Sequence, residues 1–269
     1  MQSQDGAPHV AATAATAATG SEQAHGQVRV EAGQKRVRAY LGGGLVVDTL
    51  KPLLVWERPF YPSYYLPLAD VQAKLVPTGV TEHSPSRGNA QVYDVVVGEA
   101  VAPAAALRYP DSPFAELRDH VRFIWDALDE WFEEDELVYT HPRDPYTRVD
   151  ILHSSRHVRI EIDGMTVAES RQPTMLFETR LPPRFYLPLT DVRVDLLRPS
   201  VSETHCPYKG MATYWSIDIG GKLYPDYVWI YRSPFPESQK IAGLVAFYNE
   251  KVDIYLDGEL QARPHTHFS

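Results

Sequence analysis

Strict alternation of apolar and polar residues is the clearest pattern in the chain, and it predicts β-strands. Residues 158–162 alternate (Val-Arg-Ile-Glu-Ile), turn at the Asp-Gly pair 163–164, and return through residues 166–169. A period of two places the apolar side chains of a strand on one face, and Asp-Gly is typical of a tight hairpin turn. Residues 37–41, followed by three glycines at 42–44, repeat the layout. The pattern therefore predicts two half-buried β-hairpins.

Other segments agree with a β-protein. Residues 212–219 are rich in β-branched and aromatic side chains, and residues 252–258 alternate again. The proline-rich stretches 59–67 and 182–188 cannot lie inside a helix, because each proline removes a hydrogen-bond donor and clashes with the preceding turn.

Helical signals are confined to two short windows. Residues 113–127 and 236–247 each follow or include a Ser-Pro pair that can open a helix. The predicted class is mainly β, with about one short helix in each half of the chain.

An internal repeat explains why these patterns occur twice. A step of 121 residues, adjusted by short insertions, matches 35–38 with 156–159, 54–57 with 175–178, 64–71 with 185–192, 81–88 with 203–210, 112–114 with 233–235 and 123–131 with 247–255. So many matches in one order indicate the duplication of one domain, and two copies are too few for a solenoid.

The repeat also divides the chain. We expect a first β-domain at residues 28–139, a linker at 140–150, a second β-domain at 151–262 and a tail at 263–269. Residues 1–27, rich in Ala, Thr, Gln and Gly, lack the basic start and Leu-rich middle of a secretion signal. They are predicted to be a disordered leader, the alternative being an artefact of the assigned start site.

Composition disfavours several classes of function. A formal net charge of −9 argues against nucleic-acid binding, which needs clustered Lys and Arg. No apolar run approaches the ~20 residues of a membrane helix. The single cysteine, Cys206, excludes an intramolecular disulfide and a multi-cysteine zinc site, and it fits a reducing cytoplasm. We expect a soluble cytoplasmic protein without a metal site.

Several of the matched blocks resemble a known family. The segment 176–179 (Leu-Phe-Glu-Thr), the motif 183–192 (Pro-x-Phe-Tyr-Leu-Pro-x-x-Asp-Val) and the block 206–210 (Cys-Pro-Tyr-Lys-Gly) resemble the bacterial domain-of-unknown-function family 427. Residues 133–136 and 141–146 look like the linker of its tandem-domain members. The resemblance covers nearly everything from Val28 to Leu260 and implies a compact, coiled antiparallel β-fold in each copy.

The family carries a nucleotidyltransferase label in some descriptions. The chain shows neither a glycine-rich phosphate cradle nor a paired-carboxylate metal motif at suitable spacing. The residues themselves therefore give that label no support.

The loop from Thr204 to Gly210 is the best candidate for a working site. Cys206 lies beside His205 and Lys209, and a thiol near cationic groups is a candidate nucleophile. Neighbours in an extended segment point to opposite faces, so His205 and Cys206 need not touch. The alternative is a small buried residue in a tight turn, since the first copy has Ser84 in place of the cysteine.

Charged residues recur at equivalent positions of the two copies. Lys209 matches Arg87, and such a cation could bind a carboxylate or phosphate, or could pair with Glu178 or Asp191 of its own copy. Glu178 matches Glu57, and each glutamate ends an apolar run, where it could act as a general acid or base or simply face water. The loop positions that keep their character in both copies are His83/His205, Pro85/Pro207, Arg87/Lys209 and Gly88/Gly210.

Aromatic residues are numerous for strands of this length. Most should pack in the core, but those lining a cleft beside Lys209 would suit a flat organic ligand. The set comprises Tyr64, Tyr65, Phe185, Tyr186, Tyr208, Tyr214, Trp215, Tyr227 and Trp229.

These observations predict a small-molecule enzyme with its pocket at this loop. The predicted catalytic residues are Glu178, His205, Cys206 and Lys209, and the predicted ligand contacts are Tyr186, Tyr208, Tyr214, Trp215, Glu57, His83 and Arg87. The alternatives are a non-catalytic ligand-binding or protein-interaction module, and a purely structural role for both loops. The enzyme hypothesis expects His205, Lys209 and Glu178 to converge around a cavity. The cofactor, substrate and oligomeric state are left open.

Overall fold

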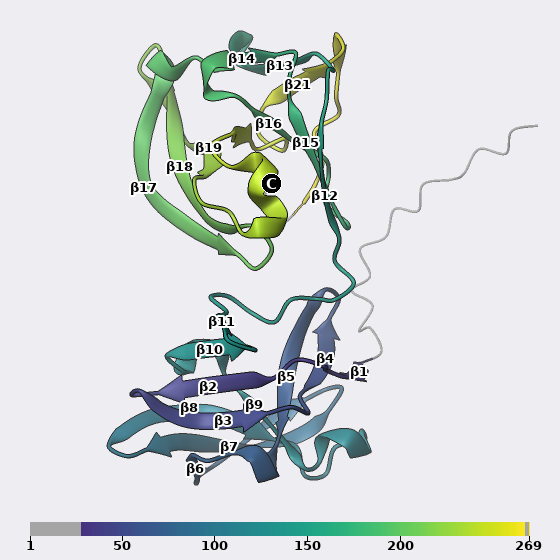
Figure 1. Ribbon diagram of the computed structural model, residues 1–269, viewed down its shortest axis with the longest axis vertical. Coiled ribbons are helices and arrows are strands. Elements are labelled where there is room, and N and C mark those ends of the chain that lie inside the picture. The colour runs from purple at the N-terminus through teal and green to yellow at the C-terminus, as the bar shows by residue number, and fades with distance from the viewer. Residues whose placement is uncertain (1–27, 267–268) are drawn as a thin grey trace, which may run out of the picture.

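Two β-domains of the same topology follow each other along the chain (Figure 1). The computed structural model describes residues 28–266 and 269, so the predicted leader at residues 1–27 lies outside the described residues. Each domain contains one seven-stranded and one four-stranded antiparallel sheet. The predicted mainly β class, with two tandem antiparallel β-domains, is confirmed.

The first domain occupies the first half of the described chain. Its larger sheet has the order β1 (Arg29–Ala32), β4 (Leu53–Arg58), β5 (Tyr61–Pro67), β9 (His120–Phe123), β8 (Ala100–Arg108), β7 (Gly88–Val97) and β6 (Lys74–Ser84). Its smaller sheet has the order β11 (Glu136–Leu137), β10 (Glu130–Glu133), β2 (Val37–Leu41) and β3 (Gly44–Thr49).

The second domain repeats this arrangement. Its larger sheet has the order β12 (Val149–His153), β15 (Thr174–Glu178), β16 (Arg184–Leu187), β20 (Val245–Phe247), β19 (Lys222–Tyr231), β18 (Gly210–Ile219) and β17 (Leu197–Cys206). Its smaller sheet has the order β14 (Met165–Ser170), β13 (Val158–Ile162), β21 (Asp253–Leu256) and β22 (Glu259–Leu260).

The helical segments are shorter than the sequence windows predicted. The first window contains only the 3-10 turns η2 (Ala115–Leu117) and η3 (Trp125–Ala127), with strand β9 between them. The second contains the 3-10 helix η6 (Pro236–Ile241), followed by strand β20. Strands form there because β9 pairs with β5 and β20 pairs with β16, and this tertiary pairing outweighs the local helical signal. The other 3-10 turns are η1 (Leu68–Asp70), η4 (Leu189–Asp191) and η5 (Val194–Leu196).

Each larger sheet is apolar on both faces. In β19, Val228 and Ile230 belong to the main core against the smaller sheet, whereas Trp229 and Tyr231 belong to a second buried cluster. A strand produces this division because its side chains alternate between faces. The second cluster, which also contains Tyr186 and Tyr214, surrounds the candidate site.

The two domains touch through equivalent hairpin turns. Phe60, between β4 and β5, lies against Arg180, between β15 and β16, with 3.1 Å from the guanidinium carbon to the ring centroid. Tyr146 of the connecting segment donates a hydrogen bond to Glu31 (2.7 Å) and its ring packs on Trp56. Within the described part of the chain, no helix has the length and apolar character needed to span a membrane.

Candidate functional site

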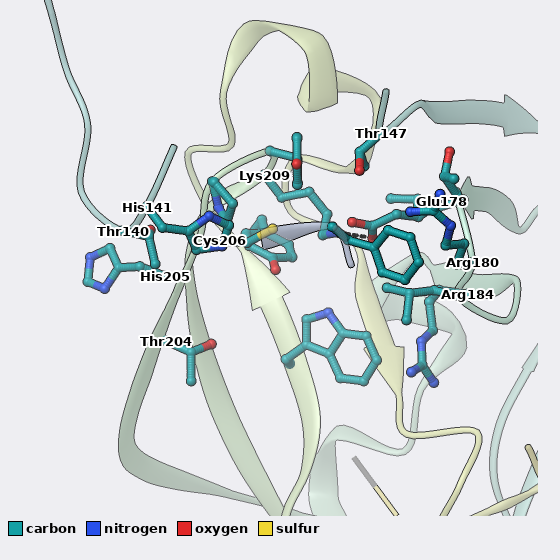
Figure 2. A pocket seen from close by; sticks show the side chains of 18 of the residues that line it. Thr140, His141, Thr147, Glu178, Arg180, Arg184, Thr204, His205, Cys206 and Lys209 are labelled. Atoms are coloured by element: carbon teal, nitrogen blue, oxygen red, sulfur yellow. Dashed lines mark hydrogen bonds and ion pairs between the residues drawn. The ribbon is translucent and has the colours of Figure 1, made fainter. Parts of the chain in front are cut away.

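A buried ion pair forms the floor of the candidate site in the second domain. Lys209 lies in the turn just before β18, and Glu178 ends β15. The Lys209 ammonium donates a hydrogen bond to Glu178, and both side chains are about 90% buried (exposed fractions of 10% and 9%). Gly210 supports the turn with a φ of +97°, a conformation that favours glycine. The structure thus contains the ion pair of Lys209 with Glu178, which was one of the alternatives for this lysine (Figure 2).

The matching ion pair of the first domain has more hydrogen-bond partners. Arg87 Nη1 lies 2.7 Å from Glu57 Oε1. The same nitrogen donates hydrogen bonds to the hydroxyl oxygens of Tyr65 (2.6 Å) and Tyr109 (2.7 Å). Tyr65 in turn donates to Glu57 (3.0 Å). Burial raises the pKa of both tyrosines, so their hydroxyl groups stay protonated at neutral pH. One cation therefore has three partners.

The second domain buries its cation as deeply but gives it fewer hydrogen-bond partners. Tyr186 and Tyr231 take the positions of Tyr65 and Tyr109. The Tyr186 hydroxyl accepts a hydrogen bond from Trp229 Nε1 (3.1 Å), and burial raises the pKa of Tyr186 to about 12. Among the described residues, Glu178 is the only side chain that accepts a hydrogen bond from Lys209.

Lys209 carries its charge despite this burial. Burial alone lowers the pKa of Lys209, but Cys206, Glu178 and Tyr186 raise it by more, and the net direction is upward. An ammonium group has three hydrogen-bond donors, of which Glu178 takes one.

A cavity of about 640 Å³ opens above this ion pair. Several aromatic side chains line it, and its volume lies within the range of small-molecule sites. The apolar and aromatic residues that the second domain contributes include Leu176, Tyr186, Tyr214, Trp229, Tyr231 and Tyr248. The first domain and the connecting segment also contribute Phe60, Tyr61, Thr140 and His141.

Cys206 and His205 both border the cavity, but their side chains point in different directions. Cys206 is half-buried and lines the cavity, and Figure 2 shows its sulfur directed toward Lys209. His205 is exposed, and its ring stacks on Tyr139 with 6.0 Å between centroids. The histidine ring points away from the pair formed by Lys209 and Glu178 (Figure 2). The expected convergence of His205 on that pair is therefore absent, because neighbours in strand β17 point to opposite faces.

The predicted aromatic contacts divide in the same way. Tyr186, Tyr208 and Tyr214 line the cavity. The Tyr208 hydroxyl accepts a hydrogen bond from the backbone N–H of Asp144 (2.8 Å), which ties the loop to the connecting segment. Trp215 instead packs against the main core on the opposite face of β18.

The remaining predicted residues belong to the first domain. Glu57 and Arg87 form the ion pair described above. His83 is exposed, with Nδ1 2.8 Å from Asn89 Oδ1. None of the three lines the cavity of the second domain.

Sequence reasoning missed two arginines of the cavity. Arg184 forms a buried pair with Glu250, with nitrogen–oxygen distances of 2.7 and 2.8 Å. Arg180 lines the cavity and lies against Phe60 of the first domain. The repeat distinguished Arg184, because the first copy has Ser63 at the matching position. The contact of Arg180 with Phe60 joins two turns, and no sequence pattern marks it.

The described residues contain no group of three or more His, Cys, Asp and Glu side chains that could hold a metal ion.

These features define a two-domain, mainly β protein with an aromatic cavity over a buried ion pair in its second domain. A family model labelled NTP_transf_9 and described as a domain of unknown function (DUF427) matches residues 29–134 and again residues 150–258. The matches cover most of the chain, so the protein belongs to the DUF427 family and carries the domain twice. No curated protein matches the chain.

Proposed function

We propose that the second domain binds a small, flat organic molecule in the cavity above Lys209 and Glu178. One observation carries this proposal: the same ion pair is enclosed by tyrosine hydroxyls in the first domain and faces a 640 Å³ aromatic cavity in the second.

The cavity suits a planar molecule with a hydrogen-bond acceptor. Trp229, Tyr214 and Tyr248 offer aromatic surface for stacking. A carbonyl or carboxylate oxygen of the ligand would accept from the remaining N–H donors of Lys209. Burying an ammonium with unused donors is costly, so this contact favours binding.

Ligand screening can test the proposal with a matched control. The variant Lys209→Met/Glu178→Leu replaces the whole ion pair by apolar residues, which a buried site often tolerates. We expect aromatic compounds that raise the melting temperature of the wild type to lose this effect in the variant. The control Arg87→Met/Glu57→Leu changes the matching pair of the first domain and should keep the ligand response. Equal responses in both double variants would contradict the proposal.

The only cysteine of the chain provides an independent reporter. Cys206 lines the cavity, so iodoacetamide should alkylate the native protein and bound ligand should slow the reaction. In Ser84→Cys/Cys206→Ser the thiol moves to the buried equivalent position of the first domain. That variant should react only after denaturation. Ligands that stabilise the protein without protecting Cys206 would place their site elsewhere.

Catalysis is a second candidate, and the orientation of Cys206 toward Lys209 favours it (Figure 2). The Cys206 thiol could attack an ester carbonyl, which would form a thioester and expel the alcohol, and the alcohol would take up the thiol proton; water would then hydrolyse the thioester. p-Nitrophenyl acetate is a suitable probe. Release of p-nitrophenol should fall in Cys206→Ser and in Lys209→Met/Glu178→Leu, but not in His205→Ala. A rate equal to that of the denatured protein would remove the catalytic candidate and leave binding intact.

A further inference from the structure

A second cavity, of about 350 Å³, lies in the first domain. We propose that it binds a small aromatic acid, meaning one planar ring bearing a carboxylate or phosphate group. Tyr61 and His141 line both this cavity and that of the second domain, with 5.2 Å between their ring centroids. The two cavities are therefore neighbours separated by a shared aromatic wall.

The lining of the first-domain cavity carries positive charge without a matching acid. Arg58 and Arg122 line it, and no Asp or Glu does. Arg122 Nε is 4.0 Å from Glu57 Oε1, but that same oxygen lies 2.7 Å from Arg87. No carboxylate among the described residues lies within ion-pair distance of Arg58. In a chain with a net charge of −9, such a cavity concentrates anions locally.

The duplication shows that this charge is specific to the first domain. In the second domain, Arg184 is neutralised by Glu250 at 2.7 Å. The first domain has Ser63 in place of that arginine and the exposed Asp126 in place of that glutamate. The guanidinium group in this part of the first domain comes instead from Arg122 on β9, the strand adjacent to β5. Ser63 is smaller than an arginine and leaves space, and Arg122 shares its nearest carboxylate, Glu57, with Arg87.

Aromatic rings complete the site. Trp125 and Trp131 stack with 4.5 Å between centroids and 8° between planes, and both line the cavity. Trp131 Nε1 donates to the backbone oxygen of Trp125 (3.1 Å), which fixes the pair. A ligand ring can pack on this surface while its anionic group reaches the guanidinium groups. The volume is at the small end for ligand sites, which favours a single ring.

Benzoate and phenyl phosphate are the probes, with benzamide as the neutral analogue, and ligand-observed NMR and tryptophan fluorescence report binding. We expect the acids to bind and benzamide to bind at least about tenfold more weakly, because a guanidinium–anion contact is a strong, charge-assisted one. Arg58→Gln and Arg122→Gln should each weaken acid binding by about tenfold. Arg148→Gln, which removes an exposed arginine just before strand β12, is the matched control and should change nothing.

Two further results separate this site from the cavity of the second domain. Acid binding should persist in Lys209→Met/Glu178→Leu, because that pair lies outside the first-domain cavity. Equal affinities in Arg58→Gln, Arg122→Gln and Arg148→Gln would overturn the proposal, as would equal binding of benzamide. Binding lost only in Lys209→Met/Glu178→Leu would overturn it too, while supporting the function proposed for the second domain.

Discussion

The two domains place one ion pair in two different surroundings. Arg87 in the first domain meets Glu57 and two tyrosine hydroxyls through its Nη1 atom. Lys209 in the second domain meets Glu178 and otherwise faces a cavity. The substitution of arginine by lysine matters here, because a guanidinium spreads five donors over a plane and an ammonium is a compact charge with three. A duplicated fold has thus kept the charge pair and changed its environment.

The largest expected effect follows from removing one partner of the ion pair and leaving the other buried. Glu178→Leu leaves the Lys209 ammonium buried without its carboxylate, which should cost about 3–5 kcal/mol of unfolding free energy. Glu57→Leu should cost less, about 1–3 kcal/mol, because Arg87 keeps Tyr65 and Tyr109 as acceptors. Urea unfolding measures both losses. The double variant Lys209→Met/Glu178→Leu should recover most of the stability. Equal losses in Glu178→Leu and Glu57→Leu would refute the stabilising role of the two tyrosine hydroxyls.

A smaller effect is expected in acid, from the buried pair of Arg184 and Glu250 in the second domain. Burial raises the pKa of Glu250, but hydrogen bonds from Arg184 and Thr266 lower it by more, so the net direction is downward. A lowered carboxyl pKa gives stability that is complete above the ordinary value of 4.5 and is lost as the pH falls through the folded-state value.

Thermal unfolding between pH 7 and pH 3 tests this. The wild type should lose about 1–3 kcal/mol that Glu250→Gln does not lose over the same interval, since the variant has no carboxyl group to titrate there. Asp126→Asn, at the matching exposed position of the first domain, should follow the wild-type profile. An unchanged pH profile in Glu250→Gln would contradict the assignment.

Much of the fold could be predicted from the sequence because its signals are local and occur twice. Period-two patterns identified the hairpin of β13 and β14, and the repeat identified the tandem domains. The predicted helices at residues 113–127 and 236–247 were wrong for the opposite reason. Val121 and Val245 pair with strands distant in sequence, and no local pattern detects such pairing.

The candidate site was predictable in part. The ends of matched strands drew attention to Glu178 and Lys209, which the structure joins. Alternation along β17 already separated His205 from Cys206, and the structure agrees. Phe60 and Arg180 were not predictable, because they meet across two turns more than a hundred residues apart.

The smallest expected effect concerns that contact between the domains. Phe60 and Arg180 both adopt positive φ, at 75° and 70°, and a cation–π contact at an exposed site contributes about 0.5–1 kcal/mol. Phe60 and Cys206 line the same cavity, so losing the contact should leave the stability of each domain nearly unchanged while easing access to Cys206. That energy corresponds to about a two- to fivefold faster alkylation of Cys206 by iodoacetamide in Phe60→Ala and in Arg180→Gln. Leu50→Ala removes an exposed apolar side chain of the first domain that does not line this cavity. Cys206 of this control variant should react at the wild-type rate. If all three variants react alike, the first domain does not restrict access to the cavity of the second.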